Sequence, residues 1–186
     1  RAMPGMTVFR PADANETVAA WRRAIAHREG PTALVLTRQS LPILPLDAQE
    51  VNAGVEKGGY IVADAEGGDP EILLIATGSE VSLVLGAHEA LKTQGLKSRV
   101  VSLPSWELFD AQDDEYRNSV LPPSVRRRLA VEAGCSLGWQ KYVGLDGDVL
   151  GIDGFGASAP AAHLAEHFGL TVDNVVQRAR ALLEGI

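Results

Sequence analysis

The alternation of short apolar runs with helical segments is the feature that most constrains the fold of this chain. Beyond residue 59 we predict five strands, at 60–63, 72–76, 99–103, 129–132 and 149–152. Four of the five are runs of Leu or β-branched residues without polar alternation. Such runs are expected for strands that are covered on both faces. Because helical patterns separate them, we predict a three-layer α/β/α sandwich around a mostly parallel five-stranded sheet.

The helices of this region are predicted from apolar residues that recur on one side. One helix follows residues 72–76 and ends at Gly95, with Val81, Val84 and Leu91 on its apolar side. Residues 113–120 predict a shorter helix, which two prolines stop. The last predicted helices have their apolar faces within 161–168 and 172–183.

The first 45 residues carry a shorter strand, helix and strand pattern. Thr7–Phe9 is a predicted strand, Gly30 and Pro31 end the helix, and residues 33–36 are a predicted buried strand. Two strands and one helix cannot cover both faces of a sheet. We therefore expect a truncated β-α-β tail of another α/β domain, and the arginine at position 1 suggests a cut end.

The helix of this tail has a predicted start and a predicted buried side. Asp13 stands three residues before Glu16, which is the spacing of a capping box. Val18, Trp21 and Ile25 recur at helical spacing and predict the buried side. The side expected to face away carries Glu16, Arg23 and His27.

Residues 39–59 interrupt the periodic pattern with prolines and glycines, which predicts a loop or linker. The expected division is therefore a remnant at 1–45, a linker at 46–59 and a complete α/β domain at 60–186.

Composition excludes several classes of function. The net charge of -7 argues against a nucleic-acid partner, and no apolar run is long enough to cross a bilayer. The basic run Arg126, Arg127 and Arg128 leads into an apolar strand and is interpreted as a solvated strand end. The single Cys135 excludes an internal disulfide and suits a reducing compartment, so we expect a cytoplasmic protein with this thiol inert.

The order His163, Glu166 and His167 matches the H-x-x-E-H pattern of one class of zinc peptidases. On a helix whose apolar side carries Leu164 and Phe168, these three polar side chains point to solvent. A catalytic zinc also needs a third ligand and a sheltered cavity. We therefore predict no metal ligands, and the peptidase remains a minor alternative.

Two loops resemble ligand-binding loops, and each has a structural explanation. Thr77 to Glu80 lies between a strand and a helix, where phosphates bind, but a capping box explains it without a ligand. An effector- or nucleotide-binding regulatory module at this loop is the alternative function. In the loop from Gly154 to Pro160, a cap at Ser158 and a first-turn proline explain most of the sequence.

Arg38 follows an apolar strand directly and precedes an irregular segment. The carboxyl ends of parallel strands face the ligand crevice of an α/β sheet, and arginine offers a planar fork to a phosphate or a carboxylate. On pattern alone, this role and a surface ion pair are equally supported.

Several stretches together resemble the transketolase family, in one order along essentially the whole chain. They are residues 7–17, 33–42, 75–81, 155–160 and 168–175. A deoxyxylulose-phosphate or dihydroxyacetone synthase is a poorer match within the same fold.

The resemblance implies a three-domain homodimer that transfers a two-carbon ketol unit between phosphorylated sugars. It would use thiamine diphosphate and a divalent cation, Mg or Ca. Residues 1–45 would be the end of the pyrimidine-binding domain, and 60–186 the C-terminal domain. Arg38 matches the family arginine that grips the sugar phosphate. The resemblance assigns no catalytic, cofactor-binding or metal-binding residue to this chain, which is expected to be inactive alone.

Overall fold

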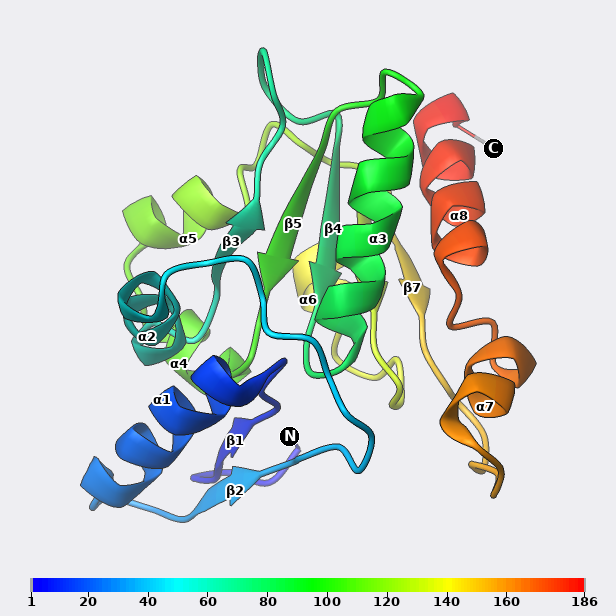
Figure 1. Ribbon diagram of the computed structural model, residues 1–186. Coiled ribbons are helices and arrows are strands. Elements are labelled where there is room, and N and C mark those ends of the chain that lie inside the picture. The colour runs from blue at the N-terminus through cyan, green and yellow to red at the C-terminus, as the bar shows by residue number, and fades with distance from the viewer. Residues whose placement is uncertain (1, 186) are drawn as a thin grey trace.

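The computed structural model describes residues 2–185 and is built around one central sheet of five strands (Figure 1). Its strand order is β3-β5-β4-β6-β7, with bounds Tyr60–Ala63 (β3), Ile72–Ala76 (β4), Ser98–Ser102 (β5), Arg128–Val131 (β6) and Asp148–Leu150 (β7). All neighbouring pairs are parallel except β3 with β5. The predicted fold class is confirmed, with the strands displaced from their predicted bounds by no more than two residues.

Helices cover both faces of this sheet. On one face lie α3 (Glu80–Thr93) and α8 (Val172–Glu184). On the other lie the shorter α4 (Trp106–Asp110), α5 (Asp114–Val120) and α6 (Gln140–Val143), while α7 (Ala161–His167) lies beyond the edge strand β7. Every residue of β4 is buried, because alternate side chains enter two cores: Leu74 packs toward α3 and α8, and Ile75 toward Trp106 and Trp139.

The N-terminal part forms the expected β-α-β unit. Strands β1 (Thr7–Phe9) and β2 (Thr32–Leu34) pair in parallel, and α1 (Ala14–Ala26) connects them. The predicted buried strand at 33–36 is wrong in two respects, because β2 stops at Leu34 and its three residues are only partly buried. The next two side chains, Val35 and Leu36, are about half exposed, at 48% and 52%.

The buried side of α1 is the reverse of the predicted one. Val18, Trp21 and Ile25 are 51%, 51% and 67% exposed, whereas Ala19 and Glu16 are buried. The small alanines let the helix approach the sheet closely, and Glu16 finds hydrogen-bond donors there, described below. The cap at Asp13 is confirmed, since its Oδ1 accepts from the Glu16 N–H at 2.8 Å. Glu16 does not return the bond to Asp13 as a capping box requires: its carboxylate accepts from the Ala12 N–H at 2.7 Å.

Residues 39–59 are not a continuous loop, because they contain α2 (Ala48–Glu56). The Asp47 side chain caps this helix, and Val51 and Val55 are fully buried. Gly54 faces the ring of Tyr60 so closely that a Cβ there would lie 2.3 Å from it. The helix packs beside α1 and so fills the space between the N-terminal unit and β3.

Within residues 2–185, no helix has the length and apolar content needed to span a membrane.

Candidate functional site

A cavity of about 540 Å³ lies at the carboxyl ends of the parallel strands. Ser79 lines it after β4, Ala133 after β6 and Ile152 after β7, and Phe168 lines it beside α7. The N-terminal unit completes the wall with residues from the segment after β2 and with Arg10. This edge is where open α/β sheets bind ligands.

Arg38 stands between two residues that line this cavity and is not itself among its lining residues. The side chain is exposed, and its neighbours Thr37 and Gln39 both line the cavity. The Thr37 hydroxyl donates to the Gln39 side-chain oxygen, which ties the two flanking residues together. An exposed guanidinium can bind a phosphate or a carboxylate through two parallel hydrogen bonds.

Two lining residues of the cavity, Arg10 and Glu80, form an ion pair that links the N-terminal unit to the sheet. The Arg10 guanidinium bonds the carboxylate of Glu80 and the backbone oxygen of Thr77 through Nη1, and its Nε lies 3.8 Å from Glu132 Oε1. The three charged side chains are only 14%, 7% and 6% exposed. The carboxylates make further bonds: Glu80 Oε2 accepts from the Ala133 N–H at 2.9 Å, and Glu132 Oε2 from Trp139 Nε1 at 2.7 Å.

The capping box predicted at Thr77 and Glu80 is wrong. Helix α3 begins after Ser79, whose side chain makes no cap bond. The Thr77 hydroxyl instead donates to the backbone oxygen of Arg10 at 3.0 Å. Gly78 has a φ of +65°, and a Cβ there would lie 2.6 Å from Arg10 Nη1. The space beside this loop that a phosphate would need is therefore filled by Arg10, which argues against an anion-binding loop.

A second polar cluster is buried between α1 and the sheet. Glu16 Oε1 accepts from the Tyr60 hydroxyl at 2.8 Å and from the Ser102 hydroxyl at 2.6 Å. Burial, which outweighs these donors, raises the pKa of Glu16 to about 7. Burial and the neighbouring Glu16 carboxylate raise the pKa of the Tyr60 phenol. This cluster joins residues far apart in the sequence but does not line the cavity at Arg38.

The remaining motifs lie outside a binding site. His163, Glu166 and His167 are exposed on α7, as predicted. In the region from 2 to 185, no group of three or more His, Cys, Asp or Glu side chains is arranged to hold a metal ion. Cys135 is exposed. The predicted cap at Ser158 is wrong, because α7 begins after Pro160.

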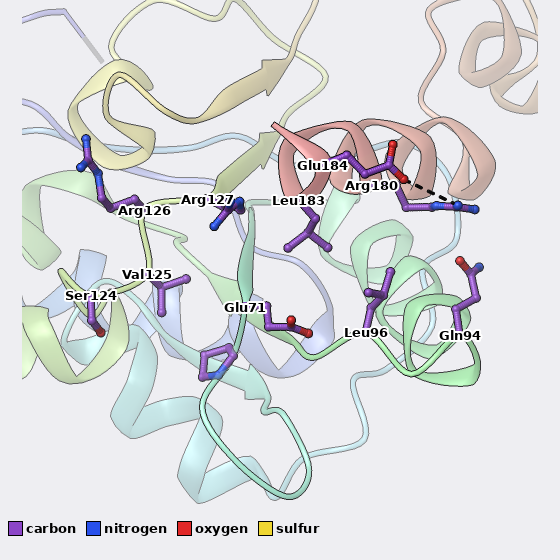
Figure 2. A pocket seen from close by; sticks show the side chains of 11 residues that line it. Glu71, Gln94, Leu96, Ser124, Val125, Arg126, Arg127, Arg180, Leu183 and Glu184 are labelled. Carbon is purple, nitrogen blue, oxygen red and sulfur yellow. Dashed lines mark ion pairs between the residues drawn. The ribbon is translucent and has the colours of Figure 1, made fainter. Parts of the chain in front are cut away.

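A larger cavity, about 910 Å³, lies at the opposite edge of the sheet (Figure 2). Arg126, Arg127 and Arg180 line it together with Glu71 and Glu184. The arginines already have partners: Arg180 pairs with Glu184, Arg126 with Asp146, and Arg127 Nε donates to the Leu182 oxygen at 2.9 Å. These pairs and the two carboxylates offset the positive charge, so this cavity is not a strong anion site.

The run of three arginines is only partly the solvated strand end that we predicted. Arg126 and Arg127 are exposed. Arg128 is half-buried and donates to the backbone oxygens of Tyr142, Leu121, Pro122 and Val125, and burial lowers its pKa.

Sequence reasoning missed Arg10 and its two carboxylate partners. The signal was present, because Arg10 follows the apolar strand β1 directly, just as Arg38 follows an apolar run. The carboxylates carried no comparable signal, since Glu80 fitted a capping pattern and Glu132 was assigned to a strand.

The fold and the cavity together define a class: a largely parallel α/β domain that shares its carboxyl-edge cavity with a β-α-β unit. The family "Transketolase-like TK C-terminal domain" matches residues 58–171, and the family "Transketolase, pyrimidine binding domain" matches residues 1–43. The chain belongs to the transketolase family.

Individual relatives match nearly the whole chain. The transketolase of Geobacillus stearothermophilus is 56% identical over 183 residues, which are 98% of this chain and 27% of that protein. The structure of the Leishmania mexicana transketolase superposes with a TM-score of 0.88 at 44% identity, covering 99% of this chain and 26% of that one. The structure of a mutant transketolase of Pichia stipitis in complex with fructose 6-phosphate superposes with a TM-score of 0.89 at 40% identity, covering 100% of this chain and 26% of that one. The chain thus spans about a quarter of the length of these relatives.

Proposed function

We propose that this chain is part of a cytoplasmic, homodimeric transketolase that moves a two-carbon ketol unit from a ketose phosphate to an aldose phosphate. The observation that carries the proposal is the exposed position of Arg38, between two residues that line a carboxyl-edge cavity, in a chain that belongs to this family. The Pichia stipitis relative is described in complex with fructose 6-phosphate, a substrate of the proposed class.

The proposed division of the chain follows the change in architecture. Residues 1–45 would be the end of the pyrimidine-binding domain, 46–59 the linker and 60–186 the C-terminal domain. The two family matches, which end at 43 and begin at 58, support these bounds. Helix α2 makes the proposed linker a packed element rather than a flexible one.

Arg38 is the proposed anchor for the phosphate of the sugar. A charge-assisted bidentate contact contributes about 1.5–3 kcal/mol, or roughly ten- to a hundredfold in affinity. Because the phosphate is remote from the reacting carbonyl, this energy acts mostly on KM. The exposed position of Arg38 leaves its donors accessible to a ligand.

Thiamine diphosphate and a divalent cation are proposed for the whole protein. When bound, the thiamine supplies the carbanion stabilisation that ketol transfer needs. The described residues do not fit as holders of the cation, because they contain no cluster of three carboxylate, imidazole or thiol groups. The contribution proposed for this chain is therefore to bind and orient substrate, and the chain alone would be inactive.

A full-length chimera tests this function. Residues 1–186 replace the matched quarter of the Geobacillus stearothermophilus relative. With thiamine diphosphate and Mg²⁺, the chimera is expected to transfer the ketol unit from fructose 6-phosphate to an aldose phosphate, whereas the isolated chain is not. A folded chimera that binds thiamine diphosphate without transferring the unit would contradict the proposal, as would transfer by the isolated chain.

A further inference from the structure

The most heavily bonded polar group near the cavity is not Arg38 but Arg10. It sits where the strand order reverses, since β5 lies on one side of β4 and β6 on the other. In doubly wound sheets this switch point is the ligand crevice. Here it is filled from within the chain: the guanidinium lies against Gly78 and between the carboxylates of Glu80 and Glu132.

Arg10 holds the N-terminal unit to the sheet through its backbone as well. Its N–H donates to the Pro104 oxygen at 2.9 Å, just beyond β5, and its own oxygen accepts from the Gly78 N–H at 2.9 Å, just beyond β4. With Glu132, which follows β6, this one residue contacts the ends of three parallel strands.

A short path leads from Arg10 to Arg38. Phe9, the residue before Arg10, pairs with Leu34 of β2 and accepts a hydrogen bond from the Val35 N–H at 2.8 Å. Arg38 follows three residues later, and Thr37 and Gln39 line the same cavity as Arg10 and Glu80. Strand β2, which precedes the segment with Arg38, is therefore paired with strand β1, which Arg10 follows directly.

We propose that Arg10 is a positioning residue for substrate binding: its ion pair with Glu80 at the switch point fixes the strand pair β1–β2 on the sheet, so that Arg38 stands at the place of the sugar phosphate. This inference rests on the proposed function. Arg10 Nη1 bonds Glu80 and Thr77 while Nε faces Glu132, and a lysine, with one nitrogen, cannot reproduce this arrangement. Loss of the pair leaves the buried Glu80 carboxylate without its positively charged partner and releases the anchor. A displacement of about 1 Å at a binding group lowers catalysis by up to about a hundredfold.

The test compares fructose 6-phosphate with fructose as donors for the full-length chimera. Arg10→Met is expected to raise KM for fructose 6-phosphate about tenfold, and to leave kcat and the kinetics with fructose within about twofold. In a chimera that already carries Arg38→Ala, adding Arg10→Met should leave the ratio of kcat/KM for fructose 6-phosphate to kcat/KM for fructose unchanged. The reason is that both residues act on the same contact with the phosphate. Arg23→Met is the matched control: this arginine belongs to the same unit but pairs with Glu56 at 3.8 Å near the surface.

The outcomes separate the inference from the function. If the chimera transfers ketol units but Arg10→Met lowers activity with both donors equally, Arg10 is a structural residue only and the inference fails. Absence of transfer in the unsubstituted chimera would instead reject the proposed function. If the Arg10→Met chimera does not fold, Arg10→Lys is tested in its place. A loss confined to fructose 6-phosphate would support the inference, and an equal loss with both donors would reject it.

Discussion

At the scale of single residues, Glu16 shows how a buried carboxylate joins distant parts of this chain. Its oxygens accept from the Ala12 N–H and from the hydroxyls of Tyr60 and Ser102, residues 44 and 86 positions away. Three hydrogen-bond donors would ordinarily keep a carboxyl group ionised. Here the effect of complete burial is larger than that of the donors, and the pKa of Glu16 rises to about 7. The protonation state of Glu16 is thus coupled to the contact between α1 and the sheet.

The stability of the chain should depend on this proton. The pKa of Glu16 is about 7 in the folded state, against an ordinary value of 4.5. Between these two pH values the Glu16 carboxyl keeps its proton in the folded chain and has lost it in the unfolded chain. The free energy of unfolding should therefore fall as the pH rises through this range, by roughly 3 kcal/mol at most. Urea unfolding at pH 5 and pH 7.5 measures the fall, and Glu16→Gln, which cannot ionise, should reduce it. Equal pH dependence in both proteins would contradict this assignment.

At the scale of elements, the turn from β4 into α3 is shaped by Arg10. Gly78 and Gly95 both have positive φ, +65° and +76°, so alanine at either position pays the same kind of backbone strain. They differ in their surroundings: a Cβ at Gly78 meets the Arg10 side chain, whereas nothing lies within 4 Å of one at Gly95.

The pair of glycines separates packing from strain. Gly95→Ala should lower the free energy of unfolding by about 1 kcal/mol, the strain of the left-handed backbone alone. Gly78→Ala should lower it by a further 1–3 kcal/mol or so, because the guanidinium must move. Chemical denaturation of both variants measures the difference, and equal losses would show that Arg10 does not pack on this turn.

The elements also show how far sequence reasoning reaches. Continuous apolar runs marked four of the five predicted strands, because a sheet covered on both faces buries both sides of its inner strands. Periodicity located α1 but not its buried side: it marks an apolar stripe such as Trp21, yet the core here lies against small residues such as Ala19. The short α4 and α6 were missed, since four or five residues show no full period. Arg38 was predicted to follow a strand directly, but β2 ends at Leu34, four residues earlier. The Arg10 ion pair joins residues 70 apart and needed the structure.

At the scale of the whole molecule, helix α1 has an apolar stripe that the described residues, 2–185, leave exposed to solvent. Val18, Trp21 and Ile25 are each at least half exposed. The two-stranded parallel sheet beside it is also smaller than parallel sheets usually are. Both features agree with a chain that spans about a quarter of its relatives' length.

The reversed orientation of α1 predicts how neighbouring substitutions differ. Trp21→Lys should change the free energy of unfolding by less than about 0.5 kcal/mol, because the side chain is already half exposed. Ala20→Lys, one residue away on the buried side, should cost about 4 kcal/mol or more, because it buries an unpaired charge. Thermal or urea unfolding of the two variants measures this. The opposite order would mean that the sequence-based orientation of α1 was right.

The proposed function depends on a contact between Arg38 and the phosphate of the sugar. The most direct measurement is KM of the full-length chimera for fructose 6-phosphate and for fructose, with Arg38→Ala against the exposed control Arg28→Ala. Arg38→Ala should raise KM for the phosphorylated donor roughly ten- to a hundredfold and leave KM for fructose nearly unchanged. An unchanged KM for fructose 6-phosphate would contradict the assignment of Arg38.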